Sequence, residues 1–206
     1  MADQVRTLIT DEDLLSYGDH VRAEVVDGEI VIDMTANKMD HSIYGMQLGT
    51  YLNVFVGMRQ LGRVGGDMAA FKLEEYPQGG IKGARVPDLF YVSFQRWSAD
   101  SPIDLVPAFA PDLAIEVISE SESHTHVLKK MNEYLDHGAV QVWHILPSLQ
   151  QVHVFTSNNR MGEIFNQADT LTGGDLLPGF AIPVRAIFES TNADLHAHTL
   201  RGLMTS

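Results

Sequence analysis

The sequence has 206 residues, of which 45% are hydrophobic and none is cysteine, and its formal net charge is −13. This length and apolar content favour a single globular domain that buries its own core. The absence of cysteine excludes disulfides, thiolate zinc sites and a cysteine nucleophile. The acidic excess argues against a strong stand-alone DNA-binding protein, because the phosphate backbone is bound mainly through basic patches.

The sequence predicts no membrane segment. Its best apolar candidate, residues 48–61, is interrupted by Asn53 and Arg59 and is shorter than the about 18 residues that span a bilayer. Residues 1–6 lack the basic start and the apolar core of a secretory signal. Together with the lack of cysteine, these features favour a cytoplasmic protein.

The first predicted elements are a short helix and a hairpin. Thr10 opens a capping-box pattern, which predicts a helix over residues 11–17. The pair Asp27 and Gly28 lies between loosely alternating apolar residues and predicts a β-hairpin over residues 21–34.

A long helix and two strands come next. Apolar residues at helical spacing predict an amphipathic helix over residues 40–61, which Gly62 would end. Residues 63–73 and 85–92 are each predicted to form one strand. Pro87 cannot donate to a strand ladder, so it belongs near a strand start or an edge.

The remaining pattern predicts a sheet covered on both faces. The apolar run at residues 113–118 is typical of a strand that is buried on both sides. Further elements are predicted in the following order: a helix over 123–137, strands over 140–146 and 150–156, a turn at 177–180, and a frayed end over 196–206. The order of elements predicts a mixed α+β sheet with helices on both faces. We expect one domain over residues 1–190 and a C-terminal tail over residues 191–206.

The strongest functional signal is a carboxylate in each of two predicted strands. Asp88 follows Pro87, and Glu116 interrupts an otherwise apolar run. Burying a carboxylate is costly unless a metal ion or an ammonium group compensates its charge. If the two strands pair, about 4.8 Å apart, both carboxylates can share one hard cation such as Mg²⁺ or Mn²⁺. The alternatives are a turn or strand-end residue after Pro87 at Asp88 and a buried ion pair at Glu116.

Helix geometry distinguishes two adjacent lysines. At about 100° per residue, the apolar stripe that includes Val127, Met131 and Tyr134 defines the buried face of the predicted helix. Lys129 then points to solvent. Lys130 lies on the flank of the stripe, where its long stem can carry the charge inward to the carboxylates. The alternative is an exposed lysine at the boundary.

Glu24 and His41 are weaker site candidates. His41 stands at the start of the long predicted helix, where it could cap the helix or reach a phosphate. Glu24 precedes the hairpin turn, and its alternative is a solvent-facing position. His124 and His126 do not face one another on a helix and are interpreted as surface residues.

A series of short motifs follows in a fixed order along the chain: 24–30, His41, 86–88, 111–119, Lys130, Tyr134, Gly138, Trp143 and 177–180. Taken together, they resemble a bacterial family of restriction endonucleases, domain of unknown function 820, in the PD-(D/E)XK nuclease superfamily. The resemblance covers residues 10–188.

The resemblance implies a restriction-endonuclease-like core with an N-terminal β-hairpin extension. Asp88 and Glu116 would match the two acidic metal ligands. The superfamily's usual lysine would fall at Ile118, and Lys130 on the next helix is the match in this family. Two departures from the family pattern are His126, where relatives carry an acid, and Leu146, where an aspartate is usual.

Three functions remain open at this point. The first is a Mg²⁺- or Mn²⁺-dependent endonuclease with catalytic residues Asp88, Glu116, Lys130, Glu24 and His41. Because of the acidic charge, it would bind DNA weakly and need a homodimer or a partner protein to provide a basic patch. The second is a catalytically degenerate protein that serves as a dimerisation or adaptor module. The third is a β-rich domain whose histidines hold a transition metal.

Overall fold

The computed structural model describes residues 8–17, 21–33, 39–66 and 68–205. The elements follow in this order: α1 (Asp11–Leu15), β1 (Arg22–Val26), β2 (Glu29–Asp33), α2 (Met39–Arg59), β3 (Gly62–Gly66), β4 (Phe71–Glu75), β5 (Ile81–Arg85), β6 (Leu89–Ser93), β7 (Leu113–Val117), α3 (His124–Asp136), β8 (Gln141–Leu146), β9 (Gln151–Thr156), β10 (Asn159–Phe165), β11 (Thr170–Gly173), β12 (Leu177–Pro183), α4 (Arg185–Phe188) and α5 (Ala193–Thr205). None of the helices in these ranges is long and apolar enough to cross a membrane.

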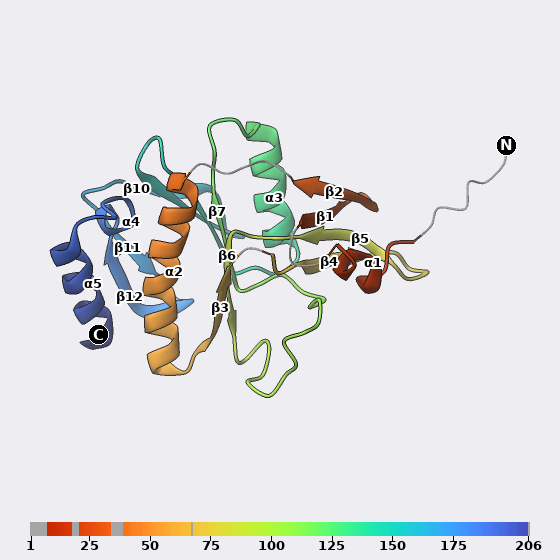
Figure 1. Ribbon diagram of the computed structural model, residues 1–206, viewed down its shortest axis with the longest axis horizontal. Helices are drawn as coiled ribbons and strands as arrows, with labels where there is room; N and C mark the ends of the chain where they lie inside the picture. Colours follow the sequence, from red (N-terminus) through yellow and green to blue (C-terminus); the bar gives the residue numbers. More distant parts are fainter. Residues whose placement is uncertain (1–7, 18–20, 34–38, 67, 206) are drawn as a thin grey trace.

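The described strands form three sheets. The largest has six strands in the order β10-β9-β8-β7-β6-β3, and it is mixed because β7 and β8 run parallel while the other neighbours are antiparallel. A four-stranded sheet has the order β2-β1-β5-β4, and β11 and β12 form a two-stranded ribbon. Figure 1 shows the four-stranded sheet at the end of the molecule farthest from α5.

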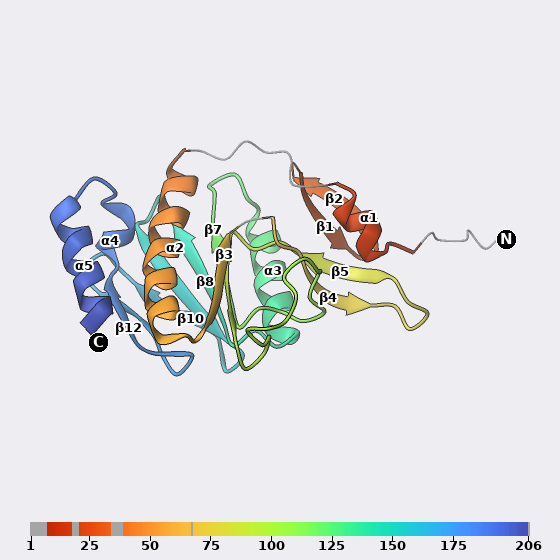
Figure 2. The same ribbon diagram turned by 60° about the horizontal axis from the view of Figure 1, so that its bottom comes forward.

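Helices cover both faces of the six-stranded sheet, as predicted. Helices α2, α4 and α5 lie on one face, and α3 lies on the other, between the large and the four-stranded sheets (Figures 1 and 2). Every residue of β7 is buried. Leu113, Ile115 and Val117 pack into the core beneath α2, whereas Ala114 packs against α3. Strand alternation therefore directs Glu116 to the α3 face.

Helix α3 confirms the predicted burial pattern. Ser123 caps it by accepting a hydrogen bond from the backbone N–H of His126. Val127, Met131 and Tyr134 are buried on one face. The helix therefore presents a buried stripe to the sheet, and its register determines which side chains reach the interior.

The predicted capping box and the predicted hairpin turn near the N-terminus are both confirmed. Thr10 and Asp13 form the reciprocal hydrogen bonds of a capping box, although α1 ends at Leu15 rather than at residue 17. Asp27 and Gly28 join β1 to β2 with positive φ angles of 53° and 78°. The predicted end of the hairpin at residue 34 lies outside the described residues.

The two predictions of long single strands are wrong. Residues 63–73 divide into β3 of the six-stranded sheet and β4 of the four-stranded sheet. Residues 85–92 divide into β5 and β6 in the same way, with a break at Val86, Pro87 and Asp88. Proline lacks the N–H that would continue a ladder, so the chain crosses between sheets here. Asp88 therefore lies in this crossing segment and not within a strand.

Three further predictions are corrected: the end of the long helix, the turn at residues 177–180 and the C-terminal tail. Gln60, with a φ of 53°, takes the left-handed position after α2, and Gly62 instead begins β3. The turn predicted at residues 177–180 lies inside β12. The tail predicted over 191–206 is largely helix α5, whose buried Leu195 and Leu203 belong to the core that includes α2. Because an amphipathic helix buries more apolar surface than a frayed end, the packing of α5 on this core is favoured. The last residue, 206, lies outside the described part.

Candidate active site

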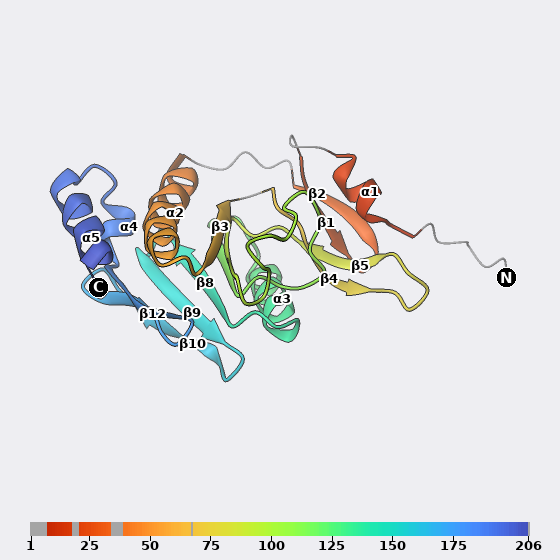
Figure 3. The same cartoon turned by 90° about the horizontal axis from the view of Figure 1, so that it is seen from below.

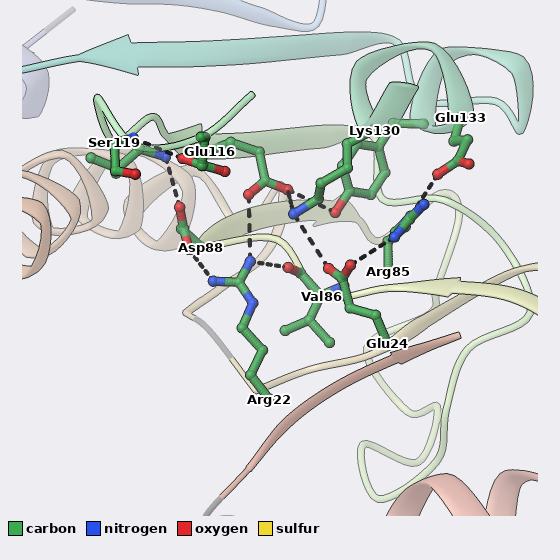
Figure 4. Close-up of polar contacts among 12 residues, drawn as sticks. Arg22, Glu24, Arg85, Val86, Asp88, Glu116, Ser119, Lys130 and Glu133 are labelled. Atoms are coloured by element: carbon green, nitrogen blue, oxygen red, sulfur yellow. Dashed lines mark hydrogen bonds and ion pairs between the residues drawn. The ribbon is translucent and has the colours of Figure 1, made fainter. Parts of the chain in front are cut away.

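Charged side chains from both larger sheets and from two helices meet at the crossing segment 86–88. The structure brings together all five residues that the sequence singled out and adds two arginines. Figure 4 shows the two arginines with Glu24, Asp88, Glu116 and Lys130. The cluster is drawn from separate elements as follows: Arg22 and Glu24 from β1, His41 from α2, Arg85 from β5, Asp88 from the crossing, Glu116 from β7 and Lys130 from α3. Figure 3 shows from below how α3 lies beside the two sheets that provide these residues.

Asp88 lies directly before the first residue of β6. The antiparallel pairing of Leu89 with Ile115 brings it beside the end of β7. Its Oδ2 accepts a hydrogen bond of 2.7 Å from the backbone N–H of Val117 and lies 3.2 Å from His41 Nε2. Its Oδ1 accepts a bond of 2.5 Å from Arg22 Nη1. Burial opposes ionisation, but the hydrogen bond from His41 and the charge of Arg22 hold the pKa of Asp88 well below its usual range.

Glu116 is buried on the α3 face of β7. Its Oε1 lies 2.8 Å from Lys130 Nζ and accepts a hydrogen bond of 3.0 Å from the Tyr134 hydroxyl. Its Oε2 lies 3.4 Å from Arg22 Nη2. Burial raises the pKa of Glu116, and the charge of Lys130 partly opposes that rise.

Lys130 lies inside the cluster, whereas Lys129 is exposed, as the sequence predicted. Besides Glu116, the Lys130 ammonium contacts Glu24 Oε1 at 3.3 Å. Burial alone would lower the pKa of Lys130, but the charges of Glu116 and Glu24 raise it above its usual value. The ammonium is therefore charged at neutral pH, with its side chain only 7% exposed.

Glu24 connects the hairpin to the crossing segment. The alternative of a solvent-facing residue is wrong, because Glu24 is 7% exposed. Its Oε1 accepts a hydrogen bond of 3.1 Å from the N–H of Val86, and its Oε2 lies 2.8 Å from Arg85 Nη1. Arg85 also bonds Glu133 on α3, at 2.5 Å. These contacts fix the backbone that carries Asp88.

Sequence reasoning missed Arg22 and Arg85. Two signals could have found them, since Arg22 shares the alternate face of β1 with Glu24, and Arg85 directly precedes the crossing segment. Both guanidinium groups are hydrogen-bonded to carboxylates of the cluster. Buried carboxylates need cationic partners, so Asp88 and Glu24 themselves imply that arginine or lysine side chains lie nearby.

The carboxylate oxygens of the cluster are suitable ligands for a hard divalent cation. Asp88 Oδ1 and Glu116 Oε2 come from different elements and face one positive group, the guanidinium of Arg22. Mg²⁺ and Mn²⁺ are commonly held by one or two carboxylates together with water. Within the described ranges, no cluster of three or more histidines and acids is placed to form a complete metal cage. His124 and His126 are exposed, which opposes the interpretation of a histidine-held transition metal.

Comparisons with known proteins agree with this fold. No curated protein is significantly similar to the chain. Solved structures that match include one from Anabaena variabilis, titled "a putative nuclease belonging to DUF820". It is 21% identical, covers 82% of this chain and 90% of its own, and has a TM-score of 0.67. The mixed α+β, restriction-endonuclease-like fold is therefore confirmed. The model of the Uma2 family, described as "Putative restriction endonuclease", matches residues 11–185. The chain belongs to the Uma2 family.

Proposed function

We propose that this protein is a divalent-metal-dependent endonuclease that hydrolyses phosphodiester bonds in DNA. The main support for this proposal is that Asp88 and Glu116 each direct a carboxylate oxygen at the same cationic group, the guanidinium of Arg22. The buried ammonium of Lys130 also contacts Glu116. Membership of the Uma2 family, whose description is "Putative restriction endonuclease", supports the same chemistry.

Asp88 and Glu116 would hold Mg²⁺ or Mn²⁺. When bound, such an ion neutralises charge on the scissile phosphate and lowers the pKa of a water molecule. The low pKa of Asp88 keeps this carboxylate ionised and able to bind a cation. The hydrogen bonds from His41 and from the N–H of Val117 both fall on Oδ2, so they orient the carboxylate.

Lys130 would orient the attacking water and stabilise the charge that develops on the phosphate. An ammonium has three N–H donors, so one can reach a water or a phosphate oxygen while Glu116 and Glu24 hold the other two. Glu24 then acts as a positioning residue, since it contacts both Lys130 and the backbone of Val86. His41 positions Asp88 in the same sense.

A single subunit does not provide the basic surface that tight DNA binding requires. The net charge of −13 repels the phosphate backbone, so we expect weak, salt-sensitive binding by an isolated subunit. We propose that a homodimer, or a partner protein, provides the missing basic surface. Sedimentation analysis with and without a DNA duplex measures this directly.

The test of the proposed function is plasmid nicking with Mn²⁺. Wild type should nick, whereas Asp88→Ala and Lys130→Ala should lose nearly all activity. Lys129→Ala is the matched control, because it removes one exposed lysine next to Lys130 and should retain activity. Equal activity in wild type and both site variants would reject the assignment. Inactivity of wild type, together with no Mn²⁺ binding by calorimetry, would favour the adaptor alternative.

A further inference from the structure

The guanidinium of Arg22 lies between the two carboxylates that would bind the metal. Nη1 bonds Asp88 Oδ1 at 2.5 Å, and Nη2 lies 3.4 Å from Glu116 Oε2. Nη2 also donates to the carbonyl oxygen of Val86. Three oxygen atoms of the kind that Mg²⁺ prefers therefore already surround one positive group (Figure 4).

We propose that Arg22 is a built-in counter-ion that competes with the divalent cation for Asp88 and Glu116, so that the metal binds only when the guanidinium leaves. The inference rests on the proposed function, because it assumes that these carboxylates are metal ligands. It adds a residue that controls the affinity of the site for metal.

Geometry makes the guanidinium and a shared metal ion compete for the same two oxygen atoms, Asp88 Oδ1 and Glu116 Oε2. Mg²⁺ lies about 2.1 Å from its oxygen ligands, whereas guanidinium nitrogens already lie 2.5 Å from Asp88 and 3.4 Å from Glu116. An ion that bridges both carboxylates would occupy the space that the guanidinium fills. Arg22 must therefore move before Asp88 Oδ1 and Glu116 Oε2 can share a metal.

The balance of charges in the cluster also favours replacement of Arg22 by the metal ion. Asp88, Glu116 and Glu24 carry three negative charges, and Arg22, Lys130 and Arg85, which contact them, carry three positive charges. A divalent ion added beside all three cations would leave a surplus of two positive charges in a buried site, which is unfavourable. If the ion replaces Arg22, the surplus is one, which a bound phosphate would neutralise.

Among the two arginines and Lys130, Arg22 is also the side chain best placed to leave. Its side chain is 14% exposed, compared with 2% for Arg85 and 7% for Lys130. Arg85 is held by Glu24 and Glu133, neither of which is a proposed metal ligand. Displacement of Arg22 alone frees oxygen atoms of both Asp88 and Glu116.

Calorimetry with Mn²⁺ tests the proposal on wild type, Arg22→Ala and Lys129→Ala. Both variants remove one positive charge from the molecule, but only Arg22 lies between the carboxylates. We expect Arg22→Ala to bind Mn²⁺ about tenfold more tightly or better, because the ion no longer displaces charge-assisted hydrogen bonds. Lys129→Ala should bind like wild type.

The outcomes separate this inference from the proposed function. Equal or weaker Mn²⁺ binding by Arg22→Ala, with binding abolished in Asp88→Ala, would overturn the competition while leaving the metal site intact. An absence of Mn²⁺ binding in every variant would overturn both ideas.

A second measurement does not depend on the folding of Arg22→Ala. In wild type, the ¹⁵N guanidinium resonances of Arg22 can be identified by their loss in Arg22→Lys. Saturating Mg²⁺ should move them to the position of a solvated guanidinium. Resonances that stay unchanged while Mg²⁺ binds would contradict the displacement.

Discussion

Replacing Lys130 by methionine removes the buried ammonium but keeps an unbranched apolar stem. In the folded protein, Lys130 Nζ lies 2.8 Å from Glu116 Oε1 and 3.3 Å from Glu24 Oε1. Because methionine fills irregular space well, little packing energy is lost. The main cost is therefore the charge of Glu116 and Glu24, which would remain buried without this partner.

Removing one partner of a buried ion pair costs about 3–5 kcal/mol. For a protein of this size, each kcal/mol lowers the melting temperature by about 2–4 °C, which gives a fall of about 6–20 °C at neutral pH. Lys129→Met is the matched control. Lys129 is itself exposed, and its ion pairs with Asp27 and Glu133 lie at the surface, so the free energy of unfolding of this variant should change by less than about 1 kcal/mol.

The pH dependence of stability tests whether the buried charge of Glu116 causes the loss of stability in Lys130→Met. Without Lys130, burial would hold the pKa of Glu116 above its usual range with less opposition. A carboxyl group with a raised pKa in the folded state contributes stability below its unfolded pKa, and that stability is lost as the pH rises. The deficit of Lys130→Met should therefore be larger at about pH 8 than at about pH 5.5, by up to about 1.4 kcal/mol for each pH unit over which Glu116 titrates.

Urea unfolding at both pH values measures this deficit. The double variant Lys130→Met with Glu116→Gln should recover part of the lost stability, since the stranded charge is gone. A Lys130→Met protein as stable as wild type, or a deficit that does not change with pH, would refute the reasoning.

Three further outcomes are expected. Burial holds the pKa of His144 at about 3, against an ordinary 6.5, so the unfolded state gains a proton first as the pH falls. This costs about 2 kcal/mol of stability at pH 5, and urea unfolding of His144→Phe should lack that loss. Gln60→Gly should raise the free energy of unfolding by about 0.5–1 kcal/mol, because glycine tolerates the φ of 53° after α2; an unchanged melting temperature would contradict this. EDTA should abolish plasmid nicking and added Mn²⁺ should restore it, whereas nicking that survives EDTA would exclude metal dependence.

Local sequence patterns were sufficient for several elements whose deciding contacts are local, although the helix stop at Gly62 and the turn at residues 177–180 were not predicted correctly. The capping box at Thr10 and the turn at Asp27 were predicted correctly because each involves residues within a few positions of one another. The inward position of Lys130 followed from helical periodicity alone. The apolar run around Glu116 predicted a strand covered on both faces, and the structure confirms that burial.

Only the tertiary structure decided which strands share a sheet and which cations complete the cluster. Neither strand break carries a local signal for the choice of sheet, so the division between β3 and β4 and the division at residues 86–88 follow from long-range pairing. Helix α5 depends in the same way on the core that it covers. Arg22 lies 66 residues from Asp88 and 94 residues from Glu116 along the chain. Alternation along β1 determines which face Arg22 shares with Glu24, but only the folded arrangement of β1, β6 and β7 selects the carboxylates that its charge meets.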